Sequence, residues 1–360
     1  MNSNNLSEIK SILFDLCSLS GVSGDEREVS KYCAEYLSNY AEENVEIDEF
    51  NNVVAVFGNE NADKTILLDA HIDRIGFIVR NIDDNGFISV DKVGGVDLRT
   101  ALDAPVIVHG KENLNGIICC MPPHLSDGKE DTAAKIDKIH IDLGLPVKRV
   151  KELVNLGDGV SFKAKPVELL NNRVTASALD NRAGVCALLR TAAIIGSKNN
   201  QNKKPLPFKV VILLSCQEET FAFGAKTRSF DIAPDEAICV DVSFSNQPSV
   251  SGQYSNIKLG KGPMLCVSPN LDRDMYNRIV SVAEKLEYEY QTEIAAGTTG
   301  TNADYIAVSR SGVKTAVISV PQKNMHTQAE IVDLNDINET GKLIAAYLRH
   351  ISECGENDYE

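Results

Sequence analysis

Two adjacent carboxylates, Glu218 and Glu219, follow a short apolar run and could take part in metal or acid–base chemistry. The run, at 210–214, is rich in β-branched residues and too short for a core helix, which predicts a strand buried on both faces of a mainly parallel sheet. Ligands and catalytic groups collect beyond the carboxyl end of such a strand. Two like charges there repel each other unless a cation binds or one group stays protonated. A solvated acidic loop explains the pair equally well when it is considered alone.

A second candidate pair follows the apolar run at 65–70, which also predicts a buried strand. His71 and Asp73 are two residues apart, and in an extended segment such side chains point the same way. A histidine can bind a metal through one ring nitrogen while a carboxylate orients the ring. A surface histidine beside a surface aspartate is the other explanation.

Three further residues lie at the predicted boundaries of elements. Asp241 ends a predicted buried strand, and an aspartate in an apolar run is costly to bury unless it is paired or bound to a cation. Asp180 precedes a predicted helix, where it is either an N-cap or a metal ligand presented from a turn. His326 follows another predicted buried strand at 314–320.

Together these residues supply nitrogen and oxygen donors without a thiolate, a set suited to Zn, Co or Mn. The candidate ligands are His71, Asp180, Glu218 or Glu219, Asp241 and His326. Five ligands exceed the three that a catalytic zinc normally takes, and they match two ions about 3.5–4 Å apart that share one carboxylate and activate a shared water. A further carboxylate beside the ions is a natural general base.

The pattern of elements predicts an α/β domain that is interrupted by a β-rich module. Amphipathic helices are expected near the N-terminus, where Ser23 and Glu26 form a capping-box pattern, and at the C-terminus. Between them, short apolar runs with turn signals such as DDNG and NLNG indicate hairpins. We therefore expect a discontinuous catalytic domain of 1–74 and 170–360, with an inserted module at 75–169.

Composition narrows the function classes. The formal charge of −15 argues against nucleic-acid binding, which needs a basic face. The N-terminus lacks a signal pattern and no apolar run is long enough to span a bilayer, so we expect neither a membrane partner nor secretion. Nine cysteines without CxxC or CxxH spacing indicate a reducing cytoplasm and no disulfide framework.

The order of the motifs resembles the tetrahedral aminopeptidase family of glutamyl or deblocking type. The motifs are H-x-D, A-L-D-N-R-A-G, E-E-x-x-x-x-G-A, V-D-V and P-x-x-x-M-H. The similarity covers nearly the whole chain and includes PPH at 122–124, IDLG at 141–144 and GDGVSF at 157–162. Members of this family are co-catalytic metallopeptidases, some of them labelled cellulases or endoglucanases. Five spaced motifs in the right order are specific, although no single one is.

The resemblance implies a mixed, mainly parallel sheet with helices on both faces and an inserted PDZ-like domain. That domain would serve dimerisation and the assembly of a twelve-subunit particle. The implied activity is the removal of N-terminal residues from peptides with two divalent ions per chain, zinc or cobalt. His71 and Asp241 would bind one ion, Glu219 and His326 the other, and Asp180 would bridge. Glu218 would be the general base, and Asp73 would orient His71.

Five positions depart from the family pattern. Asn181 stands where a second aspartate is usual, and Phe221 and Phe223 stand where glycine and arginine are usual. Lys323 and Asn324 replace the common Arg-Tyr before Met-His. These departures leave every implied ligand in place and concern the substrate pocket.

Three other functions share some of these features. A glycoside hydrolase needs two carboxylates about 5–5.5 or 6.5–9.5 Å apart, but here the carboxylates are interleaved with histidines and the chain has no Trp. A metal-dependent deacylase or amidohydrolase could share the metal centre, and would differ in not requiring a free α-amino group. An inactive scaffold would be supported only by the five departures.

Overall fold

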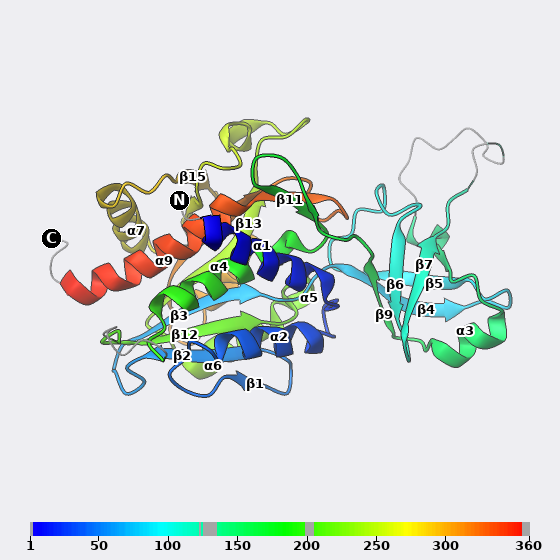
Figure 1. Cartoon of the computed structure of the whole chain (residues 1–360), viewed down its shortest axis with the longest axis horizontal. Helices are drawn as coiled ribbons and strands as arrows, with labels where there is room; N and C mark the ends of the chain where they lie inside the picture. The colour runs from blue at the N-terminus through cyan, green and yellow to red at the C-terminus, as the bar shows by residue number, and fades with distance from the viewer. Residues whose placement is uncertain (1–2, 122–123, 125–134, 199–204, 355–360) are drawn as a thin grey trace.

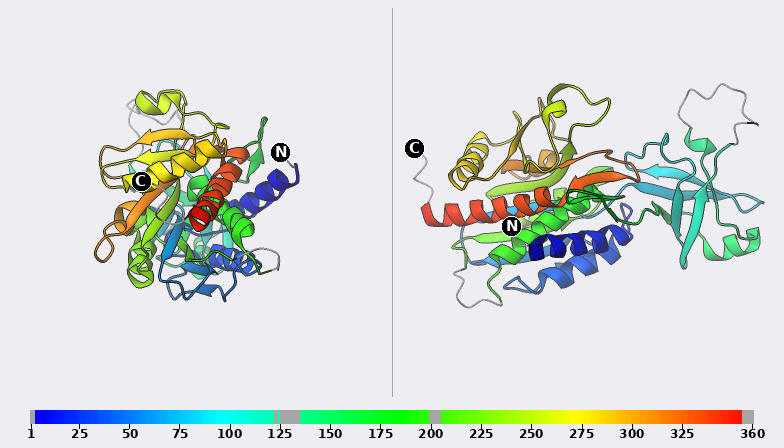
Figure 2. Two further views of the ribbon diagram at one scale, coloured as in Figure 1. Left: turned by 90° about the vertical axis from the view of Figure 1, so that its left-hand side faces the viewer. Right: turned by 45° about the horizontal axis from the view of Figure 1, so that its top comes forward.

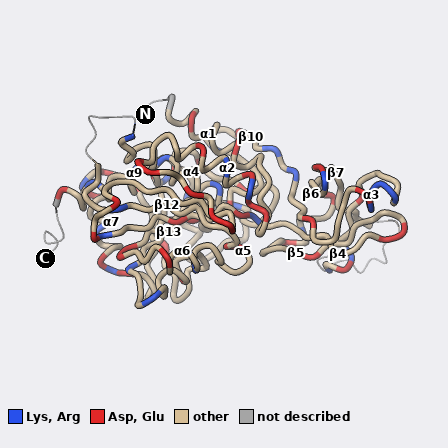
Figure 3. The backbone as a smooth tube through the Cα atoms, turned by 90° about the horizontal axis from the view of Figure 1, so that it is seen from below, with Lys and Arg blue, Asp and Glu red and all other residues tan. Residues whose placement is uncertain are grey.

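The computed structural model describes residues 3–121, 124, 135–198 and 205–354. Figure 1 shows an α/β part that holds both ends of the chain and, to one side, a β-rich lobe. The same separation is visible in the right-hand view of Figure 2. Acidic and basic residues are interspersed along both parts (Figure 3). Among the described residues, no helix is both long and apolar enough to cross a membrane.

An eight-stranded mixed sheet forms the centre of the α/β part. Its strands, in spatial order, are β1 (Glu46–Ile47), β2 (Val53–Gly58), β12 (Lys209–Ser215), β3 (Thr65–His71), β13 (Glu236–Phe244), β16 (Lys314–Gln322), β14 (Met264–Val267) and β15 (Gln291–Ile294). The four strands from β12 to β16 are mutually parallel, whereas β2 and β14 run antiparallel to them. The carboxyl ends of the four parallel strands therefore meet at one edge.

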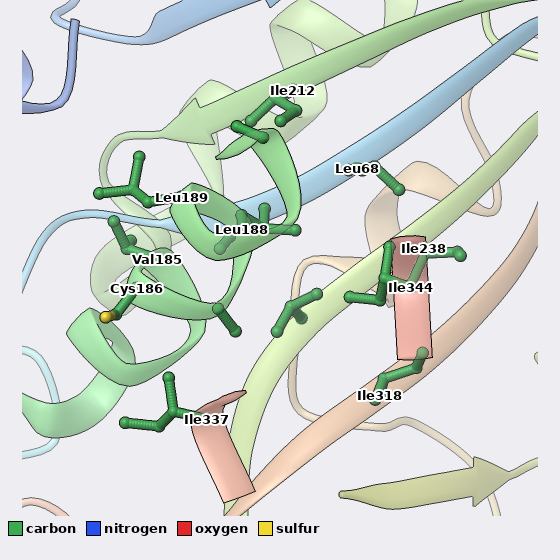
Figure 4. Packing of buried hydrophobic residues seen from close by; sticks show 14 of the residues in the cluster. Leu68, Val185, Cys186, Leu188, Leu189, Ile212, Ile238, Ile318, Ile337 and Ile344 are labelled. Atoms are coloured by element: carbon green, nitrogen blue, oxygen red, sulfur yellow. The ribbon is translucent and has the colours of Figure 1, made fainter. Parts of the chain in front are cut away.

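Helices cover both faces of this sheet. One core cluster contains residues of α1 (Ser3–Ser18), α2 (Arg27–Leu37), α4 (Leu179–Ile195), α7 (Arg273–Lys285) and α9 (Leu334–Cys354). A second cluster, on the other face, includes residues of α6 (Phe223–Ile232) and α8 (Ala303–Ile306). Leu68 and Ile212 belong to the first cluster, whereas Leu67 and Val211 belong to the second, as the alternation of a strand requires. Figure 4 shows the packing of Leu68 and Ile212 with α4 and α9. The predicted mixed α/β fold is confirmed.

The β-rich lobe contains a closed barrel of six strands with its own core. In order around the barrel, the strands are β4 (Gly76–Ile82), β5 (Ile88–Val93), β8 (His140–Asp142), β7 (Asn113–Ile118), β6 (Pro105–His109) and β9 (Gly159–Phe162). The helix α3 (Val147–Leu153) and the short 3-10 helix η2 (Ile136–Lys138) belong to the same stretch of chain. Every strand of the barrel therefore comes from within the predicted β-rich module.

The remaining elements are a small sheet and two short helices. A small sheet consists of β10 (Val167–Glu168), β11 (Arg173–Ala176) and β17 (Glu330–Asp333). The helix α5 (Glu218–Phe221) follows β12, and the 3-10 helix η3 (Gly252–Asn256) follows β13. Of the PPH motif that contributed to the resemblance, 122–123 lie outside the described residues.

Two local predictions were wrong. NLNG at 113–116 lies inside β7 rather than in a turn, because the chain already reverses at 110–112. The capping box of Ser23 and Glu26 does not form. The Glu26 carboxylate instead accepts the backbone N–H groups of Gly24 and Gln217, at 2.8 and 3.2 Å, and so links this turn to the segment before α5.

Candidate metal centre

The candidate residues converge on one cavity of about 440 Å³ at the carboxyl edge of the parallel strands. His71 is the last residue of β3, and Glu218 and Glu219 begin α5, with two residues between β12 and this helix. Asp180 lies at the start of α4, and His326 follows β16. Asp241 does not end its strand as predicted, because β13 continues to Phe244, and its side chain is buried. All six candidate residues line the cavity, and Phe244 lines it as well.

Two groups of three side chains share one carboxylate. In the first group, Nε2 of His71 lies 3.3 Å from Oδ1 of Asp180 and 3.7 Å from Oδ1 of Asp241. In the second, Nε2 of His326 lies 3.2 Å from Oδ2 of Asp180 and 3.7 Å from Oε2 of Glu219. Within each group the donor atoms all lie within 4.8 Å of one another. Asp180 thus presents one oxygen to each group, which an N-cap of α4 would not do.

The buried Asp73 carboxylate supports both the first group and α5. Its Oδ1 lies 3.4 Å from Nδ1 of His71. Its two oxygens also accept the backbone N–H groups of Glu218 and Glu219, at 2.9 and 3.1 Å. Burial would raise the pKa of Asp73, but His71 and these two N–H groups outweigh burial and lower it. One carboxylate therefore orients a candidate ligand and holds the glutamate pair in place.

The imidazole of His326 is held by the chain that follows the barrel strand β5. Its Nδ1 lies 3.1 Å from the carbonyl oxygen of Gly95. A Cβ atom on Gly95 would lie 2.5 Å from that same Nδ1, so only glycine allows this approach. Because the carbonyl can only accept, this contact requires the proton on Nδ1, and the lone pair of Nε2, which faces Asp180, is left free to bind a metal.

Glu330, which the sequence pattern did not identify, accepts hydrogen bonds from the backbone of two candidate ligands. Its Oε1 accepts the backbone N–H of His326 at 2.9 Å, and its Oε2 accepts that of Asp180 at 3.2 Å. The side chain is buried, and burial raises its pKa to about 8. It belongs to the four-residue strand β17, whose pattern has no feature that distinguishes this glutamate from a surface one.

Glu218 and Glu219 differ in their surroundings. Oε2 of Glu218 is 3.9 Å from Nε2 of His71, and Glu218 belongs to neither group of three. Burial, with Asp241 nearby, raises the pKa of Glu218 to about 8. Burial and the neighbouring Asp180 raise the pKa of Glu219 well above its ordinary value. Oε1 of Glu219 is buried without a hydrogen-bond partner.

This donor set fits divalent cations. Several carboxylates are crowded together, and among the described residues that line the cavity there is no lysine or arginine to offset them. The hydrogen bond to Asp180 raises the pKa of His326 to about 9, so the cluster attracts positive charge. Buried carboxylates of this kind are paired or bound to metal, and the unpartnered oxygen of Glu219 is available as a ligand. Imidazole and carboxylate donors suit Zn, Co or Mn.

Asn181, where the family usually has aspartate, has a structural role in this chain. Its Nδ2 donates to the carbonyl oxygen of Val240 at 2.8 Å, and its Oδ1 accepts the N–H of Gly184 at 3.0 Å. The first bond fastens the start of α4 to β13 beside Asp241, and the second is made within α4. A carboxylate could not donate the first of them.

The other four departures do not line the cavity as the structure describes it. Phe221 is exposed, with Nζ of Lys226 located 3.2 Å from its ring centroid. Phe223 packs edge-on against Phe50, with ring centroids 4.9 Å apart. Lys323 and Asn324 do not contribute to the cavity wall, whereas the next two residues, Met325 and His326, do.

Known proteins are similar to this chain over nearly its whole length. The family model of the M42 glutamyl aminopeptidases matches residues 51–343. A lysyl aminopeptidase of Pyrococcus furiosus is 32% identical over 337 residues, which cover 92% of this chain and 94% of the relative.

Two solved structures illustrate the same likeness in three dimensions. A TET aminopeptidase from the marine sediment archaeon Thaumarchaeota archaeon SCGC AB-539-E09 superimposes with a TM-score of 0.88 at 26% identity, covering 96% of this chain and 97% of that one. The TET1 peptidase of Pyrococcus horikoshii, which can assemble into a tetrahedron or a large octahedral shell, has a TM-score of 0.81 at 29% identity over 94% and 98%. The chain therefore belongs to the M42 glutamyl aminopeptidase family and is a metal-dependent aminopeptidase.

Proposed function

We propose that this aminopeptidase removes N-terminal residues from peptides with two divalent metal ions, zinc or cobalt, bridged by Asp180. The observation that carries the proposal is the position of Asp180, whose oxygens lie 3.3 Å from His71 Nε2 and 3.2 Å from His326 Nε2. His71 and Asp241 would hold one ion, and Glu219 and His326 the other. Bound there, two ions would polarise the scissile carbonyl and lower the pKa of a water molecule.

The proton transfers fall to Glu218. It lines the cavity outside both ligand groups, so its carboxylate can reach a water molecule in the cavity without being a ligand. It would accept a proton from the attacking water and deliver it to the leaving amine. Asp73 would act as a positioning residue, because it contacts His71 and the backbone of α5 rather than the cavity.

We propose the domain division and assembly expected from the sequence. The catalytic domain would be 1–74 and 170–360, and 75–169 would form the inserted, PDZ-like dimerisation domain. This is supported by a barrel whose strands all lie between Gly76 and Phe162 and which has its own core. We also propose a cytoplasmic location, which suits the unpaired state of eight described cysteines.

A dodecamer would have a mass near twelve times the 39.2 kDa of one chain. The solved structure of PhTET1-12s, which is 29% identical to this chain, contains a dodecamer and supports this number. Light scattering coupled to gel filtration measures the mass directly. A species that stays monomeric at micromolar concentration would contradict the proposed assembly.

Replacing Glu218 by Gln keeps the shape of the side chain but removes its ability to accept a proton. We expect Glu218→Gln to retain two metal ions per chain and to lower kcat by about 10²- to 10⁴-fold. The assay compares aminoacyl anilides with free and N-acetylated amino groups, and metal content is measured by mass spectrometry. The exposed Glu60→Gln is the matched control and should keep full activity.

Two results would contradict this prediction. Unchanged turnover in Glu218→Gln would remove Glu218 from the role of general base. Cleavage of only the acetylated substrates by the wild type would identify a deacylase instead.

Adding a methyl group at Gly95 should displace the imidazole of His326, because the new Cβ would lie 2.5 Å from Nδ1. We expect Gly95→Ala to weaken the binding of one of the two ions by about 10- to 100-fold, the usual effect of disturbing a residue that orients a ligand. Titration calorimetry of the metal-stripped protein measures both sites.

The control for this variant is Gly159→Ala, also in the barrel, where the added Cβ would meet only Cβ of Val22 at 3.8 Å. It should bind both ions as the wild type does. If Gly95→Ala also binds both ions with unchanged affinity, the barrel segment does not position His326.

A further inference from the structure

A fifth carboxylate, Glu293, lies in the wall of the same cavity. It is the third residue of the edge strand β15, and its side chain is 8% exposed although its neighbour Ile294 is 60% exposed. The strand thus turns its charged residue inward and its apolar residue outward. Such an inversion of polarity is costly unless the inward charge has a partner.

The partners of Glu293 among the described residues are neutral hydroxyl groups. Ser243 donates to Oε1, as does the phenol of Tyr254 at 3.2 Å, and Ser319 donates to Oε2 at 3.3 Å. Three donors favour a carboxylate over a carboxylic acid, although burial keeps the pKa of Glu293 above its ordinary value. The group is therefore fixed in position and lacks a positive counter-charge.

The partners of Glu293 separate it from the other four carboxylates. Asp180, Glu218 and Asp241 each lie within 4 Å of Nε2 of His71, and Glu219 lies within 4 Å of Nε2 of His326, whereas Glu293 is held by hydroxyl groups alone. Glu293 remains as an additional negative charge in a cavity where no described lysine or arginine contributes to the wall. The cavity thus favours a cationic group of the substrate and disfavours an acidic one.

Glu293 is positioned to bind the side chain of the substrate's N-terminal residue rather than its α-amino group. Asp241 and Ser243 lie two residues apart on β13, so their side chains point the same way about 7 Å apart. Glu293 lies one hydrogen bond beyond Ser243. The four-carbon stem of a lysine can span this length, and the ring pair of Phe244 and Tyr254 supplies apolar surface beside it.

We propose that Glu293 is a specificity-determining residue that binds the ammonium or guanidinium group of an N-terminal lysine or arginine. This inference rests on the proposed function, since it assigns the substrate class of the same cavity. Peptides that begin with glutamate would be poor substrates, because their side chain would meet Glu293.

The test compares kcat/KM for anilides of lysine, arginine, norleucine and glutamate. Norleucine has the stem of lysine without the ammonium group, so the ratio of the two isolates the charge. We expect the metal-loaded wild type to prefer lysine over norleucine by about 10- to 100-fold, the range for a hydrogen bond to a charged group. Glu293→Gln should lower kcat/KM for the lysine anilide by about 10- to 100-fold relative to the norleucine anilide, and so abolish this preference, while metal content stays unchanged. The exposed Glu289→Gln, on the segment before β15, should behave as the wild type.

Each other outcome is decisive. A wild type that cleaves norleucine and lysine anilides equally well overturns the inference and leaves the aminopeptidase activity intact, even if Glu293→Gln does not fold. Equal losses on all four substrates in Glu293→Gln would mean that Glu293 only supports the fold. If the metal-loaded wild type cleaves none of the free-amino substrates, the proposed function itself fails, and the inference with it.

Discussion

The shared carboxylate of Asp180 is the constraint on which the rest of the site depends. It lies between two imidazoles, at 3.3 and 3.2 Å, and is surrounded by Glu218, Glu219 and Asp241. Carboxylates that are this close together and this little exposed destabilise a folded chain unless positive charge is bound among them. The surrounding structure holds the carboxylates together, and the energetic compensation is left to the cations that the site is built to bind.

Two buried carboxylates outside the ligand groups act on the backbone. Asp73 accepts the N–H groups at the start of α5, and Glu330 accepts those of Asp180 and His326. The barrel side of the chain contributes as well, through the carbonyl of Gly95 on His326 and that of Thr100, which accepts from Nε2 of Gln328 at 3.3 Å. The imidazole of His326, in the second ligand group, is therefore held by a segment more than 200 residues away in sequence.

The sequence predicted the features that depend on local pattern and order. The buried runs before His71 and Glu218 predicted parallel strands, and Asp241 was identified because an aspartate interrupts an apolar run. All of the residues proposed as ligands line one cavity.

The features that the sequence did not predict depend on tertiary contacts. Glu330 and Glu293 lie in strands of four residues, too short for their pattern to show that a glutamate points inward. The capping-box pattern failed because Glu26 finds better partners in a distant turn at Gln217. Asn181 looked like a change in the site, whereas the amide is needed to bond to β13.

The most direct test of the bridged centre is an anomalous difference map from crystals of the metal-loaded protein, recorded at the absorption edge of the bound metal. We expect two peaks about 3.5–4 Å apart with Asp180 between them. One peak should lie beside His71 and Asp241, and the other beside Glu219 and His326. A single peak, or a second peak away from Glu219 and His326, would contradict the proposal that Asp180 bridges two ions.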